Sequence, residues 1–153
     1  QVKSLIQHIE VAKEADLPVI IHARNADKEI GQILSEQYHK SSFKCVMHCF
    51  SSGKHLAKIT SELGFYLSMS GIVTFPKSIC LREIFSKIST SQIILETDSP
   101  YLTPVPNRGK TNEPAFTADT AKVGAKIFGK SETEFRQLTT NNFYKLFTKV
   151  RKI

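Results

Sequence analysis

The sequence predicts an α/β fold built on a parallel sheet. Short apolar runs typical of buried strands alternate with longer segments whose apolar residues recur at helical spacing, and this unit occurs four times. Two further helical segments follow the last run. Because parallel neighbours need a crossover connection, and a helix is its usual form, such a series favours parallel pairing. We therefore expect four parallel strands with flanking helices plus two C-terminal helices.

Each predicted strand follows its own helical segment. Gly64 stands where a helix C-cap is expected, directly before the third strand. The predicted strands are residues 18–22, 43–48, 65–68 and 93–97. The apolar positions that mark the four preceding helices are Val2, Leu5, Ile6, Ile9 and Ala12; Ile30, Ile33, Leu34 and Tyr38; Leu56, Ile59 and Leu63; and Leu81, Ile84, Phe85 and Ile88.

Two helices are predicted after the last strand. The first covers residues 117–128 and stops at Gly129. The second opens with the capping-box pattern Ser131 to Glu134 and carries an apolar stripe, which we expect to cover the sheet. The stripe consists of Phe135, Leu138, Asn142, Phe143, Leu146, Phe147 and Val150. No linker or low-complexity segment divides the sequence, so residues 1–153 are predicted to form a single domain.

Composition narrows the class of protein. A chain of 153 residues with 41% hydrophobic content can bury a core. The net charge of +7 favours a polyanionic partner, although a solvated basic surface explains the same number. No apolar run approaches the ~18 residues of a membrane span, and the first residues lack the form of a signal peptide. A soluble, cytoplasmic protein is expected.

The cysteines indicate neither a disulfide framework nor a structural zinc site. Cys45, Cys49 and Cys80 are odd in number, and no two have Cys-x-x-Cys spacing. Reduced, partly buried thiols are the prediction.

Three potential metal ligands end three of the predicted strands. His22 closes the first strand, His48 the second, and Asp98 follows the fourth, at the edge where parallel sheets and barrels build their sites. Because side chains alternate along a strand, all three can converge. Imidazole nitrogens and a carboxylate suit zinc, manganese or magnesium. Each residue also has a plainer interpretation, as a hydrogen-bonded rim residue or a turn residue.

Glu96 is the most unusual of the candidate residues. It lies two residues before Asp98 in an apolar strand, where a carboxylate is costly to bury unless a cation or a metal accompanies it. Glu96 and Asp98 are therefore the candidate catalytic carboxylates. His8, His39 and His55 lie in helical segments and are predicted to be solvated.

Basic residues follow the first and fourth strands. Arg24 stands two residues past His22, and Arg108 and Lys110 lie in the loop after the fourth strand. A guanidinium suits phosphate oxygens, so these three residues are candidates for binding phosphate or substrate. The alternative is a rigid surface lid with solvated charges. Four prolines stiffen this loop: Pro100, Pro104, Pro106 and Pro114.

Five motifs together resemble the TatD family of metal-dependent deoxyribonucleases. They are PVIIHARNA (18–26), VMHCF (46–50), SGIVTF (70–75), LETDSPYL (95–102) and NRGKTNEP (107–114). The resemblance implies an amidohydrolase-like TIM barrel with its site at the C-terminal rim. It also implies that His22, His48 and Asp98 are metal ligands and that two divalent ions bind the scissile phosphate of DNA and activate a water.

The sequence departs from the family in one respect. The His-x-His pair and the bridging Glu of the family's N-terminal half are not found, and four strands are predicted where a barrel has eight. With Gln1 in place of Met, this favours a C-terminal portion of a longer hydrolase, inactive by itself. The alternatives are a fragment that only binds metal or nucleic acid, and a related hydrolase acting on an amide, lactone or ester. No membrane association and no obligate protein partner are predicted.

Overall fold

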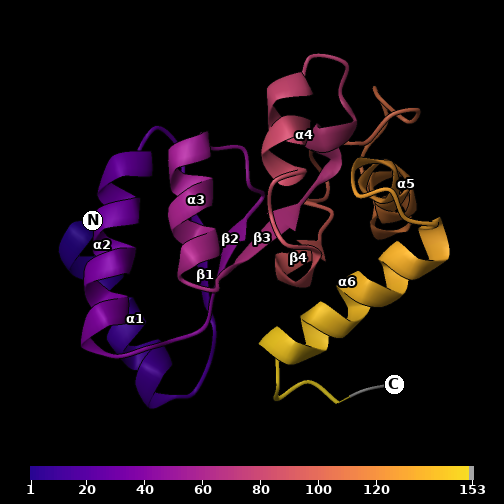
Figure 1. Ribbon diagram of the computed structural model, residues 1–153. Helices are drawn as coiled ribbons and strands as arrows, with labels where there is room; N and C mark the ends of the chain where they lie inside the picture. The colour runs from indigo at the N-terminus through magenta and orange to yellow at the C-terminus, as the bar shows by residue number, and fades with distance from the viewer. Residues whose placement is uncertain (152–153) are drawn as a thin grey trace.

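A parallel sheet forms the centre of the molecule. The structure is a computed structural model and describes residues 1–151. Its strands are β1 (Val19–His22), β2 (Cys45–His48), β3 (Tyr66–Met69) and β4 (Ile93–Leu95), which pair in that order and all in parallel. The predicted fold class is confirmed. Each strand follows a helix, and the helices lie in sequence around the sheet (Figure 1).

The helices form where the apolar positions predicted them, although Leu63 and Ile88 lie just beyond the ends of their helices. They are α1 (Val2–Glu14), α2 (Asp27–Lys40), α3 (Lys54–Glu62), α4 (Ile79–Phe85), α5 (Thr117–Ile127) and α6 (Glu132–Leu146), with short 3-10 helices η1 (Gly71–Thr74), η2 (Thr90–Gln92) and η3 (Pro114–Phe116). The capping box at Ser131 and Glu134 is present. Helix α6 ends at Leu146, so Phe147 and Val150 of the predicted stripe lie outside it, and Val150 is exposed.

One face of the sheet packs into the main core. Alternate strand residues join the helices there: Val19 and Ile21, Cys45 and Met47, Leu67 and Met69, and Ile93. On the other face Val46 and Ile94 contact Leu146, with Tyr66 and Phe147 packed against them, so the end of α6 covers part of this second face. Alternation places Ile20 on that face too, and its side chain is 60% exposed. The second face is thus only partly covered.

An apolar groove follows the outer side of β1 and α1. It has a volume of about 520 Å³, and among its lining residues Val11, Leu17 and Ile20 are exposed. Exposed apolar surface beside an unpaired strand edge is a feature that folded proteins usually cover. The groove therefore agrees with a sheet that forms part of a larger barrel.

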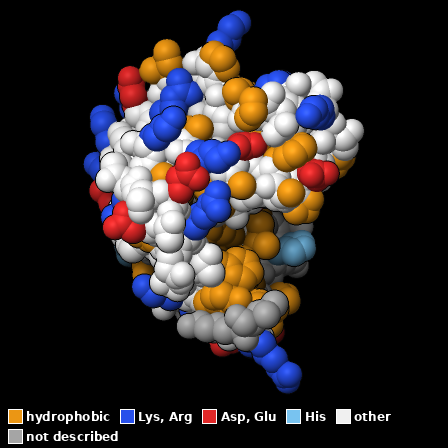
Figure 2. All heavy atoms as spheres, turned by 90° about the vertical axis from the view of Figure 1, so that its right-hand side faces the viewer, with side chains coloured by type: hydrophobic (Ala, Val, Ile, Leu, Met, Phe, Trp, Pro, Cys, Tyr) orange, Lys and Arg blue, Asp and Glu red, His pale blue; other side chains and the backbone are white. Residues whose placement is uncertain are grey.

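The side of the molecule that carries α5 and α6 has a mixed charge. Figure 2 shows lysine and arginine side chains on this face next to acidic ones, with hydrophobic side chains between them. Two of the basic side chains are paired, Lys122 with Asp119 at 2.8 Å and Arg136 with Glu132 at 3.5 Å. The excess positive charge is therefore not gathered into one patch on this face.

The three cysteines differ strongly in accessibility. Cys45 and Cys49 are buried and Cys80 is exposed. Burial raises the pKa of both buried thiols, that of Cys49 to about 11. All three are unpaired, as predicted.

We expect Cys80 alone to react rapidly with a thiol reagent at neutral pH. Thiolate is the reactive form. At Cys45 and Cys49 the raised pKa lowers the fraction of thiolate, and burial blocks access of the reagent. Timed labelling with iodoacetamide, followed by peptide mass spectrometry, measures the three rates. In urea all three thiols should react at similar rates. Rapid labelling of Cys49 in the folded protein would contradict the described packing.

None of the helices in residues 1–151 combines the length and the apolar character that a membrane crossing requires.

Candidate metal centre

The ends of β2 and β4 bring one histidine and two carboxylates together. His48, Glu96 and Asp98 each offer a ligand atom, and these atoms all lie within 4.8 Å of one another. Nδ1 of His48 lies 3.0 Å from Oε2 of Glu96, and Nε2 lies 3.2 Å from Oδ1 of Asp98. The imidazole is therefore held between two carboxylates. Convergence of His48 with Asp98, which strand alternation predicted, is present.

A neutral imidazole cannot satisfy both of these carboxylates by itself. A neutral imidazole has one N–H, so it can donate to only one of the two carboxylates. The other carboxylate then faces a nitrogen lone pair, which is repulsive unless a second proton or a metal ion is present. If Nδ1–H donates to Glu96, then Nε2 and the carboxylate of Asp98 are free to ligate a divalent ion. The donor set thus fits a metal.

One buried oxygen of this group, and another on the neighbouring strand, have no hydrogen-bond partner in the described part of the chain. Oε1 of Glu96 and Oγ of Ser68 are buried and have no hydrogen-bond partner within residues 1–151. Ser68 pairs with Ile94, two residues before Glu96, and continuing the β2–β3 register brings it next to His48. Buried oxygens of this kind normally have a donor, a water or a cation. The site can therefore accept at least one further polar group.

The backbone at both strand ends is specialised to hold these side chains. Asp98 has φ +58° and Cys49 has φ +44°, in the left-handed region that few non-glycine residues adopt. The N–H of Cys49 donates to Oε2 of Glu96 at 3.0 Å. Glu96 thereby links the end of β4 to the end of β2. Such conformations persist where surrounding contacts fix them, and they are frequent at functional sites.

Asn112 clamps the turn that follows Asp98. Its amide donates to the carbonyl oxygens of Thr97 and Tyr101, at 2.8 and 2.6 Å, and its side chain is buried. The N–H of Tyr101 donates to the carbonyl of Asp98 at 2.9 Å. The carboxylate of Asp98 is thus carried on a turn that is fixed at both ends. Sequence reasoning did not assign this role to Asn112, although it lies in one of the five motifs.

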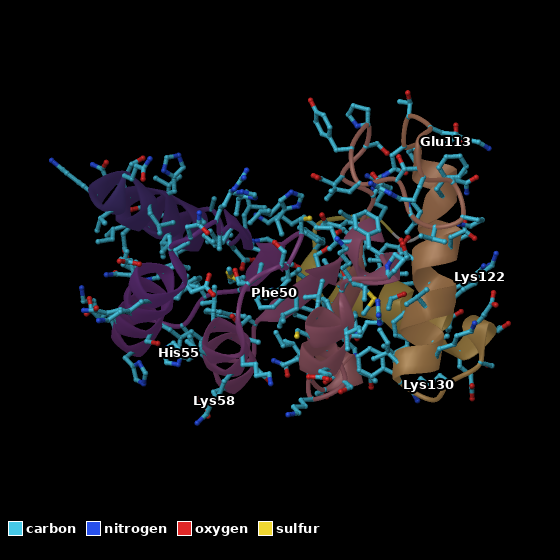
Figure 3. The ribbon with its side chains drawn as sticks, turned by 90° about the horizontal axis from the view of Figure 1, so that it is seen from above. Phe50, His55, Lys58, Glu113, Lys122 and Lys130 are labelled. Carbon is cyan, nitrogen blue, oxygen red and sulfur yellow. The ribbon has the colours of Figure 1, made fainter. Side chains whose placement is uncertain are left out.

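His22 lies beside the compact group and not within it. In the sheet it pairs with His48, and the two rings are 5.9 Å apart with a 45° tilt. Its side chain is exposed at the end of β1. Its assignment as a metal ligand stays a prediction. Figure 3, which views the molecule from above, shows His55 and Lys58 on the outer side of α3 and Phe50 in the middle of the molecule. His8, His39 and His55 are exposed, as predicted.

The predicted phosphate ligand Arg24 stands at a polar hollow. This hollow of about 370 Å³ lies between the segments that follow β1 and β2, and Arg24, Ser51 and Ser52 line it. Asp27 joins the two segments by accepting a hydrogen bond of 2.7 Å from the N–H of Gly53. The side chain of Arg24 is exposed and has no hydrogen bond or ion pair within the described chain. It is therefore available to an anionic ligand.

Arg108 and Lys110 are engaged in the loop itself. The guanidinium of Arg108 lies 4.1 Å from the ring centre of Phe75 and donates to the carbonyl of Thr103 at 3.2 Å. Lys110 donates to the side chain of Asn107 at 3.4 Å. Both side chains are exposed. Contacts of this kind favour the surface-lid interpretation for Arg108, while its phosphate role stays a prediction.

The loop after β4 is fastened to the segment after β3. The N–H of Val105 donates to Oγ1 of Thr74 at 2.9 Å. The carbonyl of Leu102 lies so close to Gly71 that a Cβ there would be 2.0 Å from its oxygen. The guanidinium of Arg82 fixes the segment after β3 by donating to the carbonyls of Val73, Phe75 and Pro76. The proline-rich loop is therefore packed against the segment after β3.

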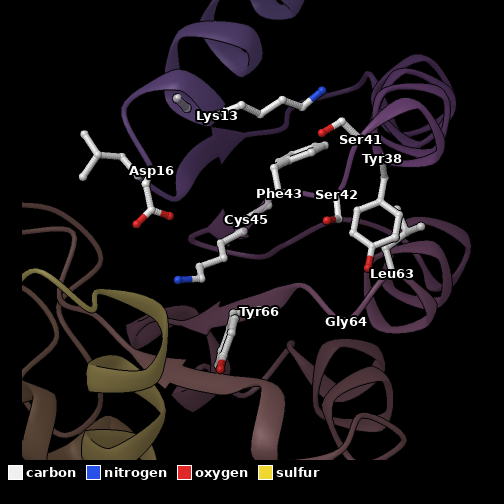
Figure 4. A pocket seen from close by; sticks show the side chains of 13 residues that line it. Lys13, Asp16, Tyr38, Ser41, Ser42, Phe43, Cys45, Leu63, Gly64 and Tyr66 are labelled. Carbon is white, nitrogen blue, oxygen red and sulfur yellow. The ribbon is translucent and has the colours of Figure 1, made fainter.

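Another pocket lies at the other end of the sheet. It has a volume of about 530 Å³ and lies near the starts of β2 and β3 (Figure 4). Its lining includes Lys13, Phe43 and Tyr66, and Lys13 lies 5.4 Å from the ring centre of Phe43. It contains none of the predicted ligands. In barrels that end of the strands serves stability, so we do not assign the active site to it.

Replacing Glu96 by glutamine is expected to weaken metal binding by about 10- to 100-fold without unfolding the protein. Glutamine keeps the shape and one acceptor oxygen, but it loses the charge that orients the imidazole of His48. Isothermal titration with zinc or manganese measures the affinity, and circular dichroism checks the fold. Glu83→Gln, on α4, is the control. Unchanged affinity in Glu96→Gln would show that Glu96 does not position His48.

The fold and the site together define a class. Strands in parallel order, a candidate divalent-metal centre at their carboxyl ends and a docked loop after the last strand are the features of metal-dependent hydrolases built on a (β/α) barrel, here with four strands of the barrel. The chain belongs to the TatD related DNase family, which matches residues 1–148.

Individual relatives agree with this assignment. The metal-dependent hydrolase YcfH of Escherichia coli K12, named as uncharacterized, is 42% identical over 147 residues, which cover 96% of this chain and 55% of that protein. YabD of Bacillus subtilis, named in the same way, is 37% identical, with coverage of 91% and 54%. The solved structure of YjjV, a TatD homologue from Escherichia coli, superposes with a TM-score of 0.82 at 28% identity, with coverage of 92% and 53%. The chain thus spans about half the length of these relatives.

Proposed function

We propose that the full-length protein is a metal-dependent hydrolase that cleaves phosphodiester bonds of DNA. The observation that carries the proposal is the imidazole of His48, held between the carboxylates of Glu96 and Asp98 at the ends of β2 and β4. The description of the family as DNases supports the choice of substrate. The net charge of +7 supports a polyanionic substrate as well. DNA is then the partner, and the cytoplasm the compartment in which it acts.

The residues of this chain would take distinct roles. Nε2 of His48 and the carboxylate of Asp98 would hold a divalent ion, with His22 next to them, while Glu96 fixes the imidazole. When bound, a divalent ion neutralises phosphate charge and makes water a stronger nucleophile. The family resemblance implies two such ions, zinc, manganese or magnesium, with further ligands from outside this chain. Arg24 would attract the phosphate backbone, since its guanidinium is exposed and unpaired within the described residues.

A direct assay tests the proposal. The full-length protein is incubated with linear DNA and magnesium, manganese or zinc, with and without a chelator, and the products are separated on a gel. We expect cleavage that depends on the metal and stops with the chelator. If the protein hydrolyses an amide, lactone or ester and does not cleave DNA, the alternative hydrolase activity is favoured. The chain of residues 1–153 is assayed in parallel, and we expect it to be inactive.

Arg24→Ala is expected to weaken DNA binding by a few-fold and to reduce the slope of log K against log salt by about 1, because one phosphate contact is lost. The fold should not change, since the side chain is exposed and makes no hydrogen bond or ion pair within the described residues. Fluorescence anisotropy with a labelled oligonucleotide at several salt concentrations measures the slope. Lys58→Ala, on the outer side of α3, is the control. An unchanged slope for Arg24→Ala would remove Arg24 from the phosphate-binding surface.

A further inference from the structure

Tyr101 exposes its ring from the turn that carries the candidate ligand Asp98. It lies three residues after Asp98, and 70% of its surface is accessible. Within residues 1–151 its side chain makes no hydrogen bond, ion pair or ring contact. Large aromatic side chains usually bury most of their surface because water solvates them poorly. Within residues 1–151 the ring of Tyr101 thus buries little surface.

The backbone of Tyr101, in contrast, is tightly fixed. Its N–H donates to the carbonyl of Asp98, and its carbonyl accepts from the amide of Asn112. The N–H of Asn112 also donates to the carbonyl of Pro100 at 3.1 Å. On the other side, Leu102 has φ +57° and its carbonyl contacts Gly71. The ring is therefore presented from a rigid turn, and a ligand that contacts it has only the side-chain torsions to immobilise.

We propose that Tyr101 is a stacking platform for a nucleobase of the DNA strand whose phosphate occupies the metal centre. This inference rests on the proposed function. The hydrogen bond from the N–H of Tyr101 to the carbonyl of Asp98 places the two residues in one turn, so the base next to a nucleotide held at Asp98 is the partner that we assign to the ring. Stacking needs an exposed π-face, and every base has one, so the contact tolerates sequence.

This platform has a consequence for the form of the substrate. The face of a base is accessible only where it is not stacked between neighbours in a duplex. Tyr101 therefore selects single-stranded DNA or frayed ends over the interior of a duplex. A phosphate contact by itself would not make this distinction, because both forms carry the same backbone charge.

The test measures binding to the full-length protein with calcium in place of the catalytic ion, so that the metal centre is occupied while cleavage is suppressed. Single-stranded oligonucleotides that contain 2-aminopurine at each position in turn report stacking through loss of emission. We expect wild type and Tyr101→Phe to quench one position strongly, and Tyr101→Ala and Tyr101→Leu not to quench it. Loss of the ring should weaken binding by about 10- to 100-fold. Tyr101→Leu tests whether apolar contact is enough without a flat ring.

An abasic site at the quenched position completes the experiment. If Tyr101 stacks on that base, removing the base weakens wild type and leaves Tyr101→Ala unaffected. Equal losses in both proteins, or equal affinity of wild type and Tyr101→Ala for the intact strand, would overturn the inference even if DNA is cleaved. If wild type binds no DNA, the proposed function fails and this inference fails with it. Circular dichroism and thermal melting of each full-length variant check that a change in DNA binding does not come from a change in folding.

Discussion

Replacing His48 by alanine is expected to remove divalent-metal binding from the protein, and with it any metal-dependent hydrolysis. The imidazole is the central group of the site, since one nitrogen faces Glu96 and the other faces Asp98. Without it the two carboxylates lose their common partner. We expect a loss of affinity above the about 10- to 100-fold that follows when a positioning partner of a ligand is removed, because a ligand itself is lost.

The variant also separates metal binding from stability. In wild type, a metal that binds only the folded state raises the melting temperature. In His48→Ala this increase should vanish, and the melting temperature without metal should fall, because Glu96 and Asp98 lose the imidazole that both contact. His55→Ala, at an exposed position on α3, is the matched control. A metal-induced shift of wild-type size in His48→Ala would show that the ion binds elsewhere.

The strands could be predicted because their apolar runs are distinct, but their ends could not. The fourth strand was predicted as residues 93–97, whereas β4 ends at Leu95. Glu96 still donates its N–H to the carbonyl of Met69, but Asp98 then turns into the left-handed region. The second strand is predicted from residue 43, whereas β2 begins at Cys45. The N–H of Val19 nevertheless donates to the carbonyl of Lys44. Hydrogen bonding between strands weakens over one or two residues at their ends, and the sequence does not indicate where it stops.

Alternation along the strands indicated that His48 and Asp98 converge, and they do, although Asp98 lies beyond the end of β4, where alternation no longer fixes the direction of a side chain. Which atoms meet does not follow from it. Oε2 of Glu96 contacts both Nδ1 of His48 and the N–H of Cys49. These contacts depend on side-chain rotamers and on the left-handed backbone of Cys49. Oxygen and nitrogen positions at this scale depend on packing between β2 and β4, which no local pattern encodes.

The docking of the proline-rich loop was the part least visible in the sequence. Composition indicated that the loop is stiff and basic, but not that Arg108 lies over Phe75 or that Val105 donates to Thr74, 31 residues earlier. Such contacts join segments that neither periodicity nor spacing relates. Gly71 carried the one available signal, because a glycine can indicate close approach of another backbone.

Gly71→Ala is expected to destabilise the protein by about 1 to 3 kcal/mol and to weaken metal binding at the same time. A Cβ at this position would lie 2.0 Å from the carbonyl oxygen of Leu102, far inside contact distance. The neighbour is backbone, so it can only give way by moving the loop. Because that loop is hydrogen-bonded through Tyr101 to Asp98, its displacement should reach the metal ligand.

Gly53→Ala adds the same methyl group where it is tolerated and is the matched control. There the nearest atom is a side-chain oxygen of Asp27 at 3.3 Å, which needs to shift by only a few tenths of an ångström. Urea unfolding measures stability, and titration with zinc or manganese measures affinity. If Gly71→Ala loses stability but keeps its metal affinity, the loop moves without disturbing Asp98, and the rigid connection between loop and ligand is wrong. If it loses neither, the loop is not docked on Gly71 as described. A combined loss, absent in Gly53→Ala, would show that the fastening of this loop is what positions Asp98.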